Sequence, residues 1–508
     1  MGCFFLKKNI MKNIKLVFVL IAASISIPVY SNNLPPIRDA SQIEEKSQKF
    51  ELQHLDEDLL RQQKLSTQTV TSKKTEKKNV ARYTGKQLIE NPEILEAIFL
   101  DALVNPNKNI LPLYIQLYEK VPNRDQSLID WANAILESDK SLTKTVSAYR
   151  RLISDFPNNN FIRFQLAEAL FYNQEYEAAK DQFQRLRATT RIPQDIAILE
   201  RFIDAINKKE DWSFSFGLSY LNDKNLSNTA EQGTQMVLPN GGVTTYNTER
   251  QKGHGILTNI GADKRWAMGN GRYLSLETGL SSHYYWDNKR YNDINAHVGF
   301  GLGYSNAELN IQITPYIDKR WYGGGLNGSN SLKEYSNRYG TNLSLSYWLS
   351  QSFKYSTHYS FGYDKYVKDI DKNNYNGPSH SFINSISYLP SSTQYWALSL
   401  DLTKKYAADR TNAFNRIGSR LTWGQEWPLG VSSSVTLGIG KRDYREASLL
   451  GIKQSNKEYS SSVSLWHKAL HFGGFTPRLT WTYNKIKSNM PIYSYDKNQT
   501  FIELNKTF

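Results

Sequence analysis

The sequence predicts an α + transmembrane β protein, with an N-terminal α-helical repeat domain at residues 81–210 and a fourteen-stranded antiparallel β-barrel at residues 211–508. Three observations lead to this prediction. A short apolar segment near the start has the form of an export signal. Residues 81–208 follow the 3.6-residue apolar period of helices, and from Trp212 onward the pattern changes to the two-residue alternation of strands.

The beginning of the chain predicts a signal peptide at residues 1–31. Residues 11–15 contain two lysines, residues 16–29 are almost wholly apolar, and Ser31 marks a cleavage point. The apolar segment of about 14 residues is short for a transmembrane helix, which needs about 20, although an uncleaved anchor is the alternative. Met11 is a second candidate start, and we expect the mature chain to begin near Asn32.

Composition excludes several kinds of chemistry. The one cysteine, Cys3, would be removed with the signal peptide, so we expect no disulfide and no thiolate metal site. The eight histidines form no His-Glu-x-x-His motif or close cluster with carboxylates, so no zinc site and no cofactor is expected. The net charge of +14 could indicate nucleic acid, but for an exported protein we favour anionic lipid headgroups or acidic partners.

Residues 32–80 are predicted to be a charged, flexible linker. This segment is polar and ends in a lysine-rich stretch at residues 72–78. Such a composition buries too little apolar surface to offset the entropy of folding. A single amphipathic helix within it is the alternative, with an apolar face made of Ile43, Phe50, Leu52, Leu55 and Leu59.

Residues 81–210 contain an internal repeat. The segment Leu117–Pro122 recurs 35 residues later as Leu152–Pro157, and residues 161–186 form the best copy of a helix–turn–helix unit. This unit resembles the tetratricopeptide repeat, whose period is about 34 residues. The match is partial, because Thr145 occupies a position where the repeat has Ala and the typical Trp and Gly are missing. An unrelated array of helical hairpins is the alternative.

Four aromatic residues on the first helix of this unit form a candidate binding groove. Stacked repeats leave a concave surface, and the predicted register places the four side chains towards it: Phe161, Phe164, Phe171 and Tyr172. So many aromatic side chains suggest a site for an extended peptide or an apolar segment. The alternative is that most of them pack in the core between repeats.

Fourteen alternating segments follow Asp211. They lie near residues 212–220, 254–266, 272–285, 293–304, 307–321, 335–348, 352–366, 379–389, 394–406, 414–426, 431–444, 457–468, 475–487 and 498–508. Short connections (268–271, 305–306, 390–393) alternate with long polar ones (221–253, 323–334, 368–378, 445–456). Bacterial outer-membrane barrels have short periplasmic turns and long external loops. The pattern therefore predicts an outer-membrane barrel with the helical domain and the C-terminus in the periplasm.

The last strand has the form of a barrel-assembly signal. Ile502, Leu504 and Phe508 share one face, and the chain ends in an aromatic residue. Lys506 interrupts this face, but a lysine near a membrane interface can extend its amine to water. A soluble β-sandwich would predict connections of mixed length and no such ending.

Together these features resemble the surface lipoprotein assembly modulators (Slam). The resemblance covers about residues 110–508 and is most specific in segments of the first and the last two strands: Trp212 with 222–225, 477–483, 488–489, 493–495 and Phe508. It implies an outer-membrane translocation factor, which delivers lipoproteins or related haem- or iron-acquisition proteins from the periplasm to the cell surface or medium. The partners it implies are this cargo, outer-membrane lipids, the barrel-assembly machinery and periplasmic chaperones, with no nucleic acid.

Three other function classes fit a barrel less well. An outer-membrane enzyme such as a lipase needs a Ser/His pair, and His283, His358 and His380 lie among many Ser and Tyr residues without a specific pattern. We therefore expect no catalytic residues. A passive porin would not need the repeat domain, and an adhesin or polysaccharide exporter remains the third alternative.

Overall fold

The computed structural model describes residues 83–391, 393–467, 469–470 and 475–507. The predicted signal peptide, the whole predicted linker (residues 32–80) and Phe508 lie outside these residues. No helix within the described ranges combines the length and apolar character needed to cross a membrane.

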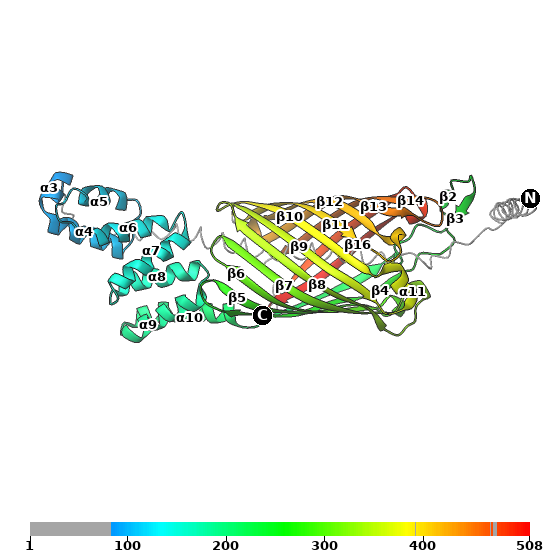
Figure 1. Cartoon of the computed structure of the whole chain (residues 1–508), viewed down its shortest axis with the longest axis horizontal. Coiled ribbons are helices and arrows are strands. Elements are labelled where there is room, and N and C mark those ends of the chain that lie inside the picture. Colours follow the sequence, from blue (N-terminus) through cyan, green and yellow to red (C-terminus); the bar gives the residue numbers. More distant parts are fainter. Residues whose placement is uncertain (1–82, 392, 468, 471–474, 508) are drawn as a thin grey trace, which may run out of the picture.

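The N-terminal part is an array of helices that extends from one end of a barrel (Figure 1). The helices are α3 (Gly85–Glu90), α4 (Pro92–Val104), α5 (Leu111–Tyr118), α6 (Gln126–Glu137), α7 (Leu142–Asp155), α8 (Asn160–Tyr172), α9 (Tyr176–Thr189) and α10 (Pro193–Glu210). Their starts follow local sequence, since Thr84 caps α3 in a capping box and the Asn159 side chain accepts hydrogen bonds from the first turn of α8. The predicted tetratricopeptide-like array is confirmed.

A continuous apolar core joins neighbouring helices of the array. Leu166, Ala167, Ala179 and Phe183 are all buried, as the repeat pattern predicts. Thr145 is also buried, and its hydroxyl donates to the carbonyl of Ser141 at 3.0 Å. The hydroxyl is satisfied inside α7, which explains how the array tolerates a polar residue where the repeat has Ala.

A polar link crosses three helices of the same core. The indole of Trp131 on α6 donates to the Gln165 side chain on α8 at 2.5 Å, and the Gln165 amide donates to the carbonyl of Leu103 in α4 at 2.8 Å. Because buried polar groups are costly unless paired, this chain of bonds fixes the relative position of the three helices.

The C-terminal part is a closed antiparallel barrel of fourteen strands. They are β1 (Ser213–Asp223), β4 (Gly253–Ala267), β5 (Arg272–Tyr285), β6 (Asp293–Ser305), β7 (Leu309–Tyr322), β8 (Lys333–Trp348), β9 (Phe353–Tyr366), β10 (Gly377–Ser391), β11 (Gln394–Lys405), β12 (Phe414–Glu426), β13 (Val431–Ala447), β14 (Lys453–His467), β15 (Thr476–Ser488) and β16 (Tyr495–Thr507). The predicted strand number and antiparallel arrangement are confirmed.

Strand β11 shows the alternation that defines the barrel wall. Trp396, Leu398, Leu400 and Leu402 point outward and are exposed, whereas the residues between them point inward and are buried. In the bilayer, the outward row faces hydrocarbon, and the closed ladder pairs backbone groups that lipid cannot hydrate.

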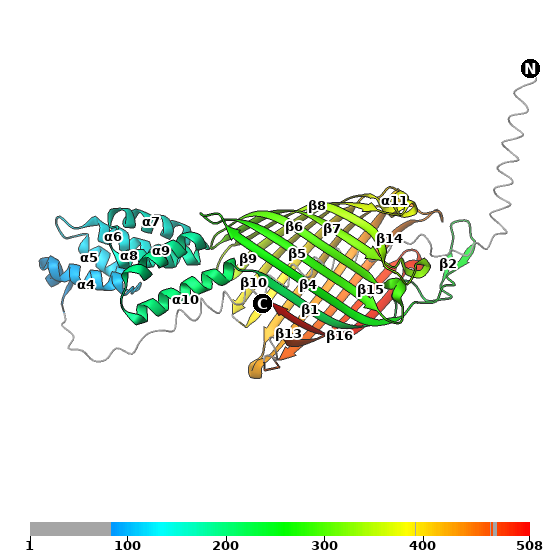
Figure 2. The same cartoon turned by 90° about the horizontal axis from the view of Figure 1, so that it is seen from below.

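The connections divide the barrel into two different ends. The end of the barrel that carries the helices has short turns, for example at residues 268–271, 306–308 and 427–430. The last strand, β16, also ends there (Figures 1 and 2). The opposite end carries the longer loops, with helix α11 (Asp369–Tyr375) and a hairpin of β2 (Gln235–Val237) and β3 (Val243–Thr245).

One predicted loop is largely strand. Residues 445–456 were expected to form a long polar connection, but β13 continues to Ala447 and β14 begins at Lys453. Asn456 is buried on the inner wall two residues before the buried Glu458, so the two-residue alternation of β14 extends into the predicted loop with polar side chains. Hydrophobicity alone therefore underestimates the length of these strands.

Candidate functional site

The inner wall of the barrel carries a set of buried and half-buried charged side chains near the long-loop ends of the strands. We call this set the lumen charge network; its members are Asp293, Asp318, Arg320, Arg338, Asp364, Asp401, Lys405, Arg416, Arg442 and Glu458. Each faces inward because it falls on the lumen side of the strand alternation. The network spans strands β6 to β14.

One part of the network lies on β6 to β11. Arg320 on β7 pairs with Asp293 on β6 at 2.6 Å and stacks near Tyr322 and Tyr335. Arg338 on β8 donates to Asp364 on β9 at 3.0 Å and to Ser379 on β10 at 2.7 Å. Lys405 on β11 also reaches Asp364, so this carboxylate is bound by two cations from strands on either side of it.

A second part of the network is centred on Arg416 of β12. Its guanidinium pairs with Asp401 on β11 and with Glu458 on β14, the latter at 2.7 Å. Glu458 also forms an ion pair with Arg442 on β13, with 2.8 Å between the charged atoms. The contact between Arg416 and Glu458 reaches across β13, so it braces the wall in addition to the backbone ladder. The wall is polar, and a polypeptide in extended form can exchange hydrogen bonds with it.

The helical array contacts the short-turn end of the barrel directly. At the turn between α8 and α9, the Gln174 side chain donates to the carbonyl of Asn306 at 2.7 Å, and the Asn173 side chain accepts from the backbone of Ala307 at 3.2 Å. Gln174 holds a left-handed φ of 63° there. The array is thus bonded to the turn between β6 and β7, as well as joined to β1 through the chain.

A glycine allows a second close approach at the same end. Gly269 in the turn between β4 and β5 has a φ of 79°, and an added Cβ would lie 3.2 Å from the carboxylate of Glu177 on α9. A side chain here would be strained and crowded. The helices therefore lie at the mouth of the barrel.

The four predicted groove residues divide into two pairs. Phe164 and Phe171 are partly buried in the core, and the rings of both contact Phe202 of α10. Phe161 and Tyr172 are exposed, at 56% and 37%. Sequence reasoning missed Phe202, which stacks on Phe183 with ring centroids 4.6 Å apart and completes the aromatic cluster. The apolar period of α10 was the available signal.

The predicted assembly signal lies on the lipid-facing side where it is described. Ile502 points outward and is 53% exposed, and the strand alternation places Leu504 on the same face. The histidines singled out in the sequence are separated: His358 bonds Ser344, and His380 bonds Tyr359 on the outer wall. The described residues contain no group of three or more metal-ligating side chains.

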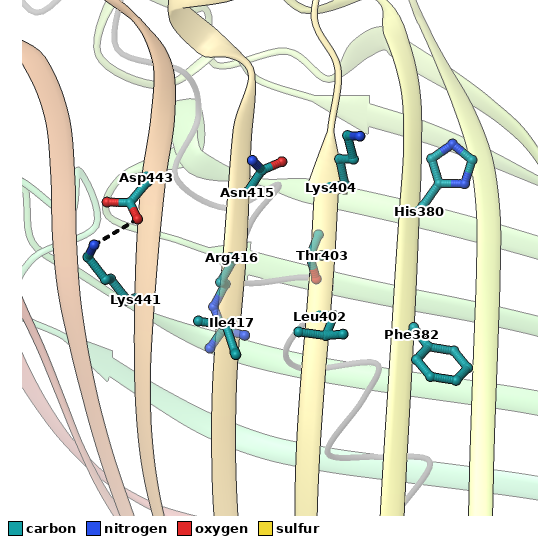
Figure 3. A pocket seen from close by; sticks show the side chains of 10 residues that line it. All are labelled: His380, Phe382, Leu402, Thr403, Lys404, Asn415, Arg416, Ile417, Lys441 and Asp443. Atoms are coloured by element: carbon teal, nitrogen blue, oxygen red, sulfur yellow. Dashed lines mark ion pairs between the residues drawn. The ribbon is translucent and has the colours of Figure 1, made fainter.

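A shallow hollow on the outer wall is lined by strands β10 to β13 (Figure 3). Its floor is apolar, with Phe382, Leu402 and Ile417. Lys404 and Lys441 lie on its side nearer the long loops, where Lys441 pairs with Asp443 at 2.9 Å. The arrangement offers cations above an apolar surface, as a site for an anionic lipid would.

The profile of one protein family, the surface lipoprotein assembly modifier, matches residues 212–508, and the profile of its N-terminal TPR repeats matches residues 81–183. The chain belongs to this family. Surface lipoprotein assembly modifier 1 of Haemophilus influenzae is 38% identical over 84% of this chain and 87% of its own length. The surface lipoprotein assembly modifier of Pasteurella multocida is 31% identical over 96% of each chain.

A more distant relative carries a different name. The hemophilin secretion modulator of Acinetobacter baumannii is 22% identical over 90% of this chain and 94% of its own length. Membership of the surface lipoprotein assembly modifier family and a closed fourteen-stranded barrel together place this chain in the outer membrane. The resemblance seen in the sequence is thereby confirmed.

Proposed function

We propose that this protein delivers lipoproteins, or related soluble proteins for haem or iron acquisition, from the periplasm to the cell surface. The observation that carries the proposal is the helical repeat array bonded to the mouth of a barrel with a polar, charged inner wall. Relatives named for lipoprotein assembly or for hemophilin secretion match it over most of its length. A porin for small solutes needs no such array.

The two parts support different steps. The array, on the periplasmic side, binds cargo in an unfolded or partly folded form, and the exposed Phe161 and Tyr172 offer apolar contacts for this binding. The lumen charge network then offers hydrogen bonds of both polarities along the wall. Work would come from folding of the cargo outside, which gives transport its direction. No bond is made or broken in this scheme, so we propose no enzymatic role.

The remaining partners follow from the barrel surface. Lys404 and Lys441 above the apolar hollow of Figure 3 support binding of anionic lipid headgroups of the outer leaflet. The face shared by Ile502, Leu504 and Phe508 supports recognition by the barrel-assembly machinery, with periplasmic chaperones delivering the unfolded barrel and the cargo.

Surface labelling tests the proposal. Cells with and without this protein are treated with an impermeant label, and labelled lipoproteins are compared. We expect one or a few lipoproteins to lose surface labelling while their total amount is unchanged. Equal labelling of all of them would contradict the proposal. Single-channel recording of the purified protein adds a second check, because a porin would conduct ions steadily without cargo.

A further inference from the structure

The ladder that closes the barrel is the shortest one. Strands β1 and β16 pair over Ser215–Ser219 and Glu503–Thr507, which is five residues from each strand among those described. By contrast, β1 pairs with β4 along all eleven of its residues, and β16 pairs with β15 over eleven. The ladder between β1 and β16 stops at Ser219 and Glu503, although both strands continue towards the long-loop end (Figure 2).

The interrupted part of this seam faces the outer leaflet. The paired residues lie at the end of the barrel that carries the helices, which is the periplasmic end in the proposed orientation. The continuing parts, residues 220–223 of β1 and 495–502 of β16, lie in the outer half. Side chains bridge the seam there: the Lys497 amine pairs with Asp223 at 2.5 Å and donates to the Asn228 side chain at 3.3 Å.

The lipid-facing side of β16 is also unusual in this half. From the long-loop end of β16, the first three side chains that face the lipid are Asp496, Asn498 and Thr500, and all three are exposed. Counted in the same way from its outer end, β11 presents Lys404, Leu402 and Leu400. Polar side chains on this face contact hydrocarbon poorly. The outer half of β16 is therefore a poor match for hydrocarbon, and it borders the seam where backbone pairing is least complete.

Packing between external loops covers the outer end of the seam. Residues of the first loop (Ala230, Met236 and Tyr246) form a buried cluster with Met490 and Ile492 of the loop between β15 and β16. This cluster lies beyond the strand ends. The cluster holds β1 and β16 together at their long-loop ends without hydrogen bonds between their backbones. Its side chains must separate when the seam opens fully.

We propose that the seam between β1 and β16 is a lateral exit, through which lipid-anchored cargo passes from the lumen into the outer leaflet. This inference rests on the proposed function. Acyl chains belong in hydrocarbon, whereas the inner wall is polar, so a lipid-anchored chain that enters the lumen needs a side opening. Opening costs least where the fewest backbone hydrogen bonds break. The exposed edge of β1 at residues 220–223 can pair with an extended segment of the cargo as it passes.

A reversible cross-link tests the exit. In a Cys3→Ser background, Ser219→Cys and Glu503→Cys place two cysteines on paired, lumen-facing positions at the end of the ladder. The matched control is Ser385→Cys with Ser399→Cys on β10 and β11, paired positions whose side chains lie 3.0 Å apart. We expect oxidation to reduce lipoprotein display at least tenfold in the seam variant and not in the control, with recovery on adding reductant.

The outcomes separate the two proposals. If the oxidised seam variant displays lipoprotein as fast as its reduced form, the lateral exit is wrong and the proposed function stands. If the parent protein itself displays no lipoprotein, the proposed function is wrong. A photo-cross-linking residue in place of Tyr220 or Ile502, which flank the seam, should capture cargo during export. If the same photo-cross-linking residue at Leu400, on the opposite wall, captures as much cargo, the proposed lateral exit is also wrong.

Discussion

The charged side chains of the lumen charge network form ion pairs, so the loss of one residue is expected to leave its partner's charge uncompensated. Arg416 neutralises two carboxylates from two other strands, and all three side chains are largely buried. Removing one partner of a buried ion pair leaves charge without compensation, which costs about 3–5 kcal/mol, whereas an exposed pair contributes about 0–1 kcal/mol. The inner and outer walls should therefore respond differently to the loss of a cation.

Replacing Arg416 by Met is expected to destabilise the barrel by about 3–5 kcal/mol, because Asp401 and Glu458 lose their shared partner. The measurement is the temperature at which the purified barrel unfolds in detergent, followed by the loss of its β-sheet signal in circular dichroism. Lys441→Met on the outer wall is the control, since its pair with Asp443 is exposed. Equal shifts in both variants would contradict the role given to the network.

A buried carboxylate in the helical array should make its stability depend on pH. Burial raises the pKa of Glu168 on α8 above its ordinary value, and nearby Lys108 partly offsets the rise. Because the folded state favours the protonated form, Glu168 lowers stability as pH rises from the ordinary carboxyl range, about 4.3, through the raised pKa.

Glu168→Gln should therefore raise the unfolding temperature of the helical signal at pH 7.5, and the gain should disappear near pH 4. Circular dichroism of the full-length protein in detergent, recorded from pH 4 to pH 8, measures this effect. A gain of the same size at every pH would show that the change acts through packing and not through ionisation.

At the scale of elements, α10 connects the two parts of the chain. Its Phe202 contacts Phe164, Phe171 and Phe183, and its last residue, Glu210, pairs with Lys180 of α9 at 3.3 Å. The helix ends at Glu210 and β1 begins at Ser213, so only Asp211 and Trp212 lie between them. The last repeat and the first strand are therefore coupled with almost no free chain between them.

Two substitutions should distinguish a residue that stabilises the helical array from one that binds cargo. They are Phe202→Ala, in the aromatic cluster, and Phe161→Ala, on the exposed surface. Loss of Phe202 leaves a cavity in the aromatic cluster and should cost about 3–5 kcal/mol. Phe161 is mostly exposed, so its loss should change stability by less than about 0.5 kcal/mol. We expect Phe161→Ala to weaken cargo capture by the full-length protein in a pull-down while its melting curve is unchanged. Unaltered capture would remove Phe161 from the proposed binding surface.

At the scale of the whole molecule, the two ends of the barrel differ in what they hold. The short-turn end is bonded to the helical array through Asn173 and Gln174, and the backbone pairing of β1 with β16 is confined to this half. The long-loop half contains the lumen charge network and the interrupted seam. The periplasmic end of the barrel is therefore held by more backbone and side-chain bonds than the outer half of the seam. This difference fits a protein that receives cargo at the periplasmic end and releases it at the outer half.

Much of this organisation was predictable because it depends on local periodicity. Alternation along a strand and the spacing of apolar residues along a helix are set by backbone geometry, so the sequence alone predicted fourteen strands, the repeat array and the change near Asp211. The ends of β13 and β14 were missed because their last inward residues are polar, and hydrophobicity carries no signal for them.

The sequence by itself determined the number and type of elements, their order and the family to which the chain belongs. Only the tertiary structure decided which charges meet, since Arg416 and Glu458 are 42 residues apart and lie across an intervening strand. It also decided that the ladder between β1 and β16 stops at Ser219. In both cases the register at which strands meet decides the contact, and register is a property of the whole sheet. For β1 and β16 that register is set by closure, which joins the first and last strands of the barrel.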